Sequence, residues 1–170
     1  LSLHDALPIL KLWTIYEDVI YHFSMNKETH LRPVIEEYAF PMSHLFIDLI
    51  KTINYEDMYE SLKYINMSGI SFYNVGNIDK NTIEIRVPNG TIDEVNWQNN
   101  INFFKHILLS TLDNNKDWDL IDHYINSYAK KYYNLKNYEK ENIEKAKELG
   151  DFIYNNEDDK LSFIKQYLKK

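Results

Sequence analysis

Residues 69–92 read GISFYNVGNIDKNTIEIRVPNGTI, and this stretch decides the fold class. Its first part, residues 69–75, is rich in β-branched and aromatic side chains, and the last part, residues 82–87, alternates apolar and polar side chains with period two. The residues between them, 76–81, are typical of a turn, and the Pro-Asn-Gly sequence at 88–90 ends the second strand. The pattern predicts two neighbouring antiparallel strands.

Amphipathic helices are predicted on both sides of these strands, because apolar residues recur at three- and four-residue spacing. The predicted helices cover residues 10–25, 43–53 with Ser43 as N-cap, 56–65, 93–112 and 117–133. The last part of the chain is predicted to form one or two exposed helices with a break near Gly150 to Asp159.

The long helix that follows the strands has the clearest start signal. Asp93 can cap it, and Glu94 lies at the positive end of its dipole. One apolar stripe, Trp97, Ile101, Phe104 and Leu108, is predicted to face the core, with Phe103 and Ile107 beside it. The sequence therefore predicts an α+β fold, in which a partial antiparallel sheet (a β-hairpin at about 69–87) is packed by amphipathic helices.

The composition is that of a globular protein, with 44% apolar and 26% charged residues in a chain of 170. No apolar run approaches the ~18–20 residues of a membrane helix, so we expect no membrane partner. The absence of cysteine excludes disulfides and favours a cytoplasmic location. The net charge of −7 disfavours nucleic acid as the main partner.

The first nine residues differ from the rest of the chain. Ile, Asn, Lys and Tyr make up 70 of the 170 residues, which is typical of a low-GC bacterium or phage, but residues 1–9 contain no Asn, Lys or Tyr. They look like a translated sequencing adapter, an artefact that we do not expect to be part of the native fold. They resemble the apolar part of a signal peptide less closely, since a basic start is missing. On the adapter interpretation, the chain is the later part of a longer protein.

The second predicted strand carries the candidate chemistry. Ile83, Ile85 and Val87 share one face, and Glu84 and Arg86 share the other. A carboxylate can hold Mg²⁺, and a guanidinium can bind a phosphate or a carboxylate bidentately. The alternative is an ordinary surface ion pair, which contributes about 0–1 kcal/mol and has no chemical role. The chain has 17 lysines and only two arginines, which favours a specific need for arginine at position 86.

The segment as a whole resembles the amidoligase family, which consists of carboxylate–amine ligases with a glutamine-synthetase-like fold. The family's strand reads Thr-(Ile/Val)-Glu-(Phe/Ile)-Arg, as residues 82–86 do, and a Pro/Asn/Gly turn and a long helix follow it. The preceding strand of the family ends near an asparagine, which Asn74 matches. The resemblance covers about residues 10–112, and residues 113–170 form a helical extension.

The resemblance implies ATP- and Mg-dependent amide formation between a carboxylate and an amine through an acyl phosphate. It implies that Glu84 is a metal ligand, that Arg86 is a catalytic clamp on a phosphate or carboxylate, and that Asn74 binds ATP together with Arg86. Asn89 stands where glutamine synthetases have Asp, so no role is carried over to it.

The family's Gly-x-Glu-x-Glu strand and its His-x-His segment are absent from the sequence. We therefore expect this truncated chain to bind Mg-ATP poorly and to lack ligase activity by itself. The alternative function is a non-catalytic helical interaction protein of a phage or mobile element, in which the hairpin is only structural. A nucleic-acid-binding accessory factor is the third possibility, and the acidic charge disfavours it.

Overall fold

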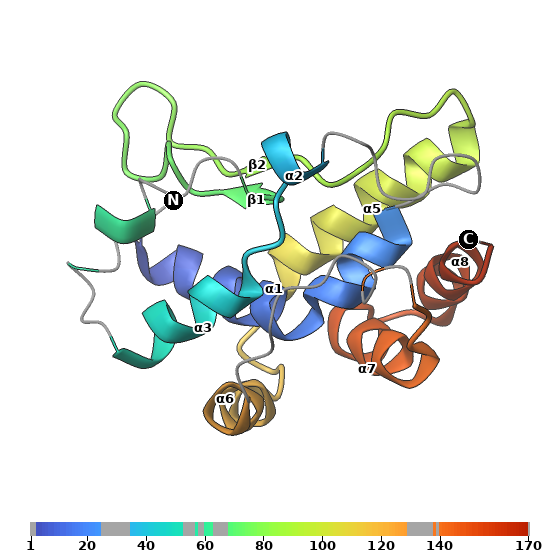
Figure 1. Cartoon of the computed structure of the whole chain (residues 1–170). Helices are drawn as coiled ribbons and strands as arrows, with labels where there is room; N and C mark the ends of the chain where they lie inside the picture. Colours follow the sequence, from blue (N-terminus) through green and yellow to red (C-terminus); the bar gives the residue numbers. More distant parts are fainter. Residues whose placement is uncertain are drawn as a thin grey trace. The chain divides into compact units, whose positions relative to one another are not determined.

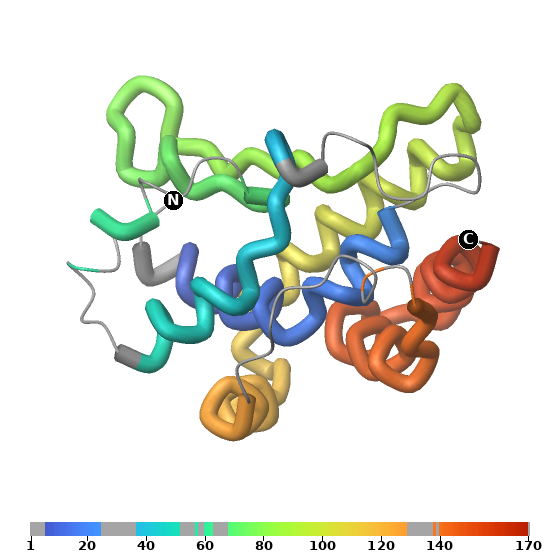
Figure 2. Tube along the Cα trace, in the orientation of Figure 1, coloured from blue at the N-terminus to red at the C-terminus, as the bar shows by residue number. Residues whose placement is uncertain are grey.

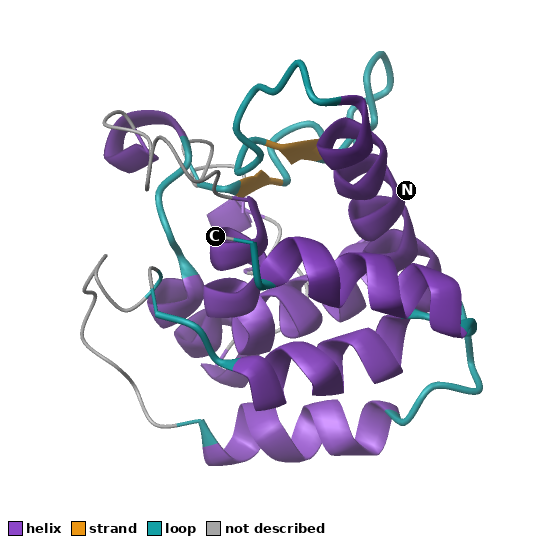
Figure 3. Ribbon diagram, turned by 90° about the vertical axis from the view of Figure 1, so that its right-hand side faces the viewer, coloured by secondary structure: helices purple, strands orange, loops and turns teal. Residues whose placement is uncertain are grey.

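The computed structural model describes residues 3–24, 35–52, 57, 60–62, 68–128, 138 and 140–169, without the side chains of residues 3–5, 35, 36 and 52. This part of the chain is mainly helical with one small antiparallel sheet, which confirms the α+β class (Figures 1 and 3). The helices are α1 (Leu3–Ser24), α2 (Ile35–Tyr38), α3 (Ser43–Thr52), α5 (Glu94–Ser110), α6 (Trp118–Ser127), α7 (Ile143–Ile153) and α8 (Glu157–Tyr167), and the strands are β1 (Ile70–Ser71) and β2 (Glu84–Ile85).

The chain divides into two compact units that alternate along the sequence. Unit 1 comprises Leu1–Ile15, Pro33–Val87 and Trp118–Tyr133, and unit 2 comprises Tyr16–Arg32, Pro88–Asp117 and Asn134–Lys170. Helix α1 contributes to both units, and its backbone leaves helical geometry at Tyr16, with φ −107° and ψ 16°. The division between the units therefore coincides with a kink in α1.

Helix α1 begins at Leu3, so the predicted start at residue 10 is wrong. Pro8 lies inside the helix and removes one backbone hydrogen bond. Burial of Ala6 and Ile9 opposes this cost, because both side chains leave water almost completely. The adapter origin of residues 1–9 stays a prediction.

In unit 1, α3 packs against α6. Phe46 and Ile47 of α3 are buried, as are Ile121 and Ile125 of α6. The predicted helix is confirmed as α3, but Ser43 is its first residue rather than its N-cap, since the Met42 carbonyl accepts from the Phe46 amide at 2.9 Å. The predicted helix 56–65 lies largely outside the described residues, of which 57 and 60–62 are helical.

Strands β1 and β2 pair in antiparallel orientation, with Ile70 opposite Ile85 and Ser71 opposite Glu84. This pairing confirms the predicted hairpin partners. Each strand is only two residues long, however, and the connection between them runs from residue 72 to residue 83 (the green loop in Figure 2). The predicted strands over 69–75 and 82–87 are therefore too long, and the predicted six-residue loop is too short.

Local hydrogen bonds explain why the strands are short. Asn81 Oδ1 accepts from the Gly76 amide at 3.1 Å, and Asn77 Oδ1 accepts from the Asp79 amide at 2.8 Å. Gly76 has a positive φ of 78°, which glycine adopts at little cost. These turns satisfy backbone groups that a longer ladder would otherwise pair.

In unit 2, α5, α7 and α8 pack against one another. Phe23 of α1 joins their core, with its ring centroid 4.3 Å from that of Phe103 and 5.2 Å from that of Phe163. The rings of Phe103 and Phe163 are stacked, with centroids 5.0 Å apart. Aromatic packing of this kind accounts for much of the apolar burial in this unit.

Two predicted features of unit 2 are wrong. The buried face of α5 carries Phe103, Phe104 and Ile107, whereas Trp97 and Ile101 are 56% and 44% exposed. The C-terminal helices are not exposed on all sides, because they bury a set of apolar side chains, Ala146, Leu149, Phe152, Ile153, Phe163 and Tyr167. The break between them, at residues 154–156, falls within the predicted range.

Candidate functional site

The Glu84–Arg86 pair lies on the more exposed face of β2, as the alternation predicts. Arg86 Nη2 donates to Glu84 Oε2 at 2.7 Å, and the two side chains are 24% and 53% exposed, respectively. On the opposite face Val87 is buried, and Ile83 and Ile85 are half-buried. The strand therefore places a carboxylate and a guanidinium side by side at the surface.

Backbone hydrogen bonds hold this strand in place. The Arg86 amide donates to the Gly69 carbonyl at 2.8 Å, and the Gly69 amide donates to the Phe40 carbonyl at 3.1 Å. Phe40 also forms an isolated parallel bridge with Ser68. Among the described residues, β2 pairs with β1 alone. The pair thus lies on a strand that is anchored along one edge.

The two charges stabilise each other. The hydrogen bond from Arg86 lowers the pKa of the Glu84 carboxyl, partial burial opposes this effect, and Coulombic attraction to Arg86 adds to it. The hydrogen bond to Glu84 in turn raises the pKa of Arg86, and partial burial again opposes the change. Both groups are therefore ionised at neutral pH.

Asn74 does not belong to this pair. It lies in the turn that follows β1, where its carbonyl accepts from the Asn77 amide at 3.2 Å. Its side chain is half-buried, and no hydrogen bond between described residues joins it to Glu84 or Arg86. Its proposed contact with ATP stays a prediction.

The fit of these residues to Mg²⁺ is incomplete. Mg²⁺ takes six oxygen ligands in near-octahedral geometry, usually one or two of them carboxylates. Within the described ranges, no group of three or more His, Cys, Asp or Glu side chains could hold a metal ion. Glu84 offers a single carboxylate, one oxygen of which already accepts from Arg86. Described residues alone therefore do not form a magnesium site, and the metal role of Glu84 stays a prediction.

A second group of polar side chains was not singled out by the sequence. Lys11, Lys51, Asp122 and Asn126 line a cavity in unit 1. Lys11 and Asp122 form an ion pair although 111 positions separate them in the sequence. Because no short motif joins residues so far apart, only the fold brings them together.

The described helices include none with the length and hydropathy that crossing a membrane requires.

Comparisons of the chain with protein-family models, with curated proteins and with solved structures find no match. The resemblance at residues 82–92 to the amidoligases therefore remains a proposal.

Proposed function

We propose that the Glu84–Arg86 pair of β2 is part of the active site of a carboxylate–amine ligase of the amidoligase type. One observation carries the proposal: Glu84 and Arg86 lie side by side on the more exposed face of a strand whose other face is buried at Val87 and half-buried at Ile83 and Ile85. A strand held in this way fixes the direction of its side chains, as a binding site requires. Arg86 would bind a phosphate or a substrate carboxylate.

The guanidinium suits this role because it offers parallel N–H donors in a planar fork. In the structure one of these donors is used by Glu84. A phosphate that carries two negative charges would compete with the single charge of Glu84 for the same donors. Glu84 therefore orients Arg86 when no ligand is bound, and it can turn one oxygen toward a cation.

The proposed activity is ATP- and Mg-dependent amide formation between a carboxylate and an amine. The described residues would provide only part of such a site, so we expect this chain to bind Mg-ATP weakly by itself.

The two arginines make a direct test possible. With arginine labelled with ¹⁵N, the chain should give two Nε–Hε signals in an NMR spectrum, one from Arg32 and one from Arg86. Inorganic triphosphate at millimolar concentration should shift the Arg86 signal and leave that of Arg32 in place. Arg86→Lys assigns the signal because it removes it, and the remaining signal of Arg32 should not shift with triphosphate. Two arginine signals that both stay fixed would contradict the proposal.

A variant separates the metal role of Glu84 from its role as a partner of Arg86. Glu84→Gln removes a competing charge, so triphosphate without Mg²⁺ should bind Arg86 more tightly. If Glu84 also binds the metal, the increase in affinity that Mg²⁺ gives to the wild type should disappear in this variant. Glu94→Gln, on the exposed start of α5, is the matched control and should change neither affinity.

The activity itself is tested on the full-length protein encoded by the gene of this chain. ADP release should depend on both a carboxylate and an amine, and Arg86→Lys should abolish it. Release that is independent of Arg86 would contradict the proposal.

The second candidate is a non-catalytic helical interaction protein. It is favoured by the exposed apolar side chains Trp97, Ile101 and Leu109 of α5, with Leu112 just beyond its end. Exposed apolar side chains that lie close together are typical of interaction sites. Sedimentation velocity over a range of concentrations tests whether the chain associates with itself, and Trp97→Lys should abolish any association through this face.

A further inference from the structure

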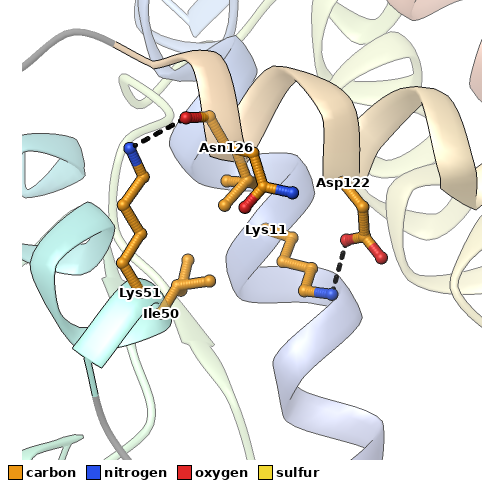
Figure 4. A pocket seen from close by; sticks show the side chains of 6 residues that line it. Lys11, Ile50, Lys51, Asp122 and Asn126 are labelled. Carbon is orange, nitrogen blue, oxygen red and sulfur yellow. Dashed lines mark hydrogen bonds and ion pairs between the residues drawn. The ribbon is translucent and has the colours of Figure 1, made fainter.

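A cavity of about 460 Å³ lies in unit 1 (Figure 4). Its volume falls in the range of small-molecule sites, roughly 300–1,000 Å³. Three helices, α1, α3 and α6, supply its described lining residues, which are Lys11, Ile50, Lys51, Asp122, Ile125 and Asn126. The cavity is distinct from the Glu84–Arg86 pair, neither of whose members lines it.

The ammonium group of Lys51, a residue of α3, lies at the C-terminal end of α6. Its Nζ donates to the carbonyl of Asn126 at 3.4 Å and to that of Tyr128 at 3.1 Å. These carbonyls carry the partial negative charge of a helix end, which a lysine can compensate. An ammonium group has three N–H donors, so one donor of Lys51 remains for a ligand.

Lys11 Nζ donates to Asp122 Oδ1 at 2.5 Å, and this bond leaves two further N–H donors on the ammonium group. Figure 4 shows the Asn126 amide between the side chains of Lys51 and Lys11. Its NH₂ group adds donors to the same space. The two ammonium groups are donors only and have no acceptor, so the cavity favours a ligand with acceptor oxygens.

The charge of the lining sets the kind of anion. Among the described lining residues, two ammonium groups face one carboxylate, and the end of α6 subtracts roughly half a charge from the balance. This residual charge matches a monoanion. A dianion such as phosphate would be repelled by Asp122 and by the carbonyl end of α6. Ile50 and Ile125 add apolar walls, against which a short hydrocarbon chain can pack.

We propose that this cavity binds a small organic monocarboxylate. The ammonium groups of Lys11 and Lys51 hold its carboxylate, and Ile50 and Ile125 contact its apolar chain. The proposal does not rest on the ligase function, since it uses none of the residues of β2.

Pentanoate is the probe that tests the proposal, and pentanamide is its uncharged match. In ¹H–¹⁵N spectra of the whole chain, millimolar pentanoate should shift the backbone amides of Ile50, Lys51, Ile125 and Asn126. Pentanamide should bind at least about tenfold more weakly than pentanoate, because it lacks the negative charge. Inorganic phosphate should also bind more weakly than pentanoate. Equal binding of pentanoate and pentanamide, tighter binding of phosphate, or shifts outside the cavity would each overturn the proposal.

Lysine variants identify the groups responsible. Lys11→Met should weaken pentanoate binding by about fivefold or more, since one charge-assisted contact is lost. Lys51→Arg keeps a cation at the end of α6 and should keep the binding, whereas Lys51→Met should lose it. The amide spectrum shows whether each variant is folded. Lys80→Met, on the exposed loop between β1 and β2, is the control, and an equal loss in this variant would refute the assignment.

Discussion

The phenol of Tyr138 donates a hydrogen bond of 2.9 Å to Oε2 of Glu17, whose side chain lies in unit 2 and is only 2% exposed. The residues on either side of Glu17 also bind partners that are distant in sequence. Tyr16 donates to Glu148, and Lys145 forms an ion pair with Asp18 at 2.6 Å. Three consecutive residues of α1 thus make polar contacts with α7 and residue 138. Buried polar groups are costly without such partners.

Tyr138→Phe should destabilise the chain by about 1 to 3 kcal/mol, because it deprives a buried carboxyl group of a donor. Urea unfolding followed by far-UV circular dichroism measures the change. Tyr73→Phe removes the same hydroxyl from an exposed side chain and serves as the control. An equal and small effect of both substitutions would show that the bond to Glu17 does not stabilise the fold.

Asp93→Ala should cost about 1 kcal/mol of stability, since it removes the N-cap of α5. Asp93 Oδ1 accepts from the amides of Val95 at 2.9 Å and Asn96 at 3.0 Å. Asp93→Asn keeps an oxygen acceptor at this position and should retain most of the stability. The same unfolding measurement checks both variants, and a loss in Asp93→Asn as large as that in Asp93→Ala would contradict a capping role.

Asp159 should make stability sensitive to acid. Hydrogen bonds lower its pKa, first that from Asn156 at 2.5 Å and then that from Asn102 at 2.7 Å, with a smaller contribution from His106, while burial opposes them. A lowered pKa in the folded state means that this stabilisation is fully present above the ordinary value of about 3.9 and is lost as the pH falls through the lowered value.

The wild type should therefore exceed Asp159→Asn in stability at neutral pH, and the difference should shrink below about pH 4. Urea unfolding at neutral and acid pH measures this change. Asp79→Asn, in an exposed turn, is the control. A difference between the wild type and Asp159→Asn that is the same at both pH values would exclude the proposed linkage.

Tyr167 should make stability sensitive to alkali. Burial raises the pKa of its phenol to about 12, although the bond from the Asn142 amide, 2.7 Å long, lowers it in part. The folded state thus favours the neutral phenol, and this stabilisation is present below the ordinary pKa of about 10 and is lost as the pH rises toward 12. Tyr167→Phe should lose less stability over this interval than the wild type does. Parallel losses in the two proteins would contradict this prediction.

The sequence predicts the start of α5 better than it predicts the buried face of this helix. The start of α5 is evident because an aspartate followed by an acidic first turn is a local signal, and the structure confirms Asp93 as its N-cap. The buried face of α5 is not evident, because apolar residues occur on more than one side of this helix. Phe103 and Ile107 are buried because α7 and α8 pack near them, and no local pattern specifies those neighbours.

The candidate site shows the same limit. Period-two alternation places Glu84 and Arg86 on one face, as the structure confirms. The length of the strand could not be predicted, since asparagine side chains compete for the backbone groups between Phe72 and Ile83. The pairing of Lys11 with Asp122 depends on how α1 and α6 pack, so no neighbouring residues signal it.

The alternation of the two units along the chain limits how this protein can be dissected. Each unit is assembled from three separate stretches of sequence, so no single cut yields either unit intact. Removing residues 134–170 would strip α7 and α8 from unit 2 while leaving Phe23 and Phe103 without their aromatic partner Phe163. Folding must also close long loops before these contacts form, which is typical of slower folding proteins. Deletion series are therefore poorly suited to mapping activity here, and point substitutions are the better tool.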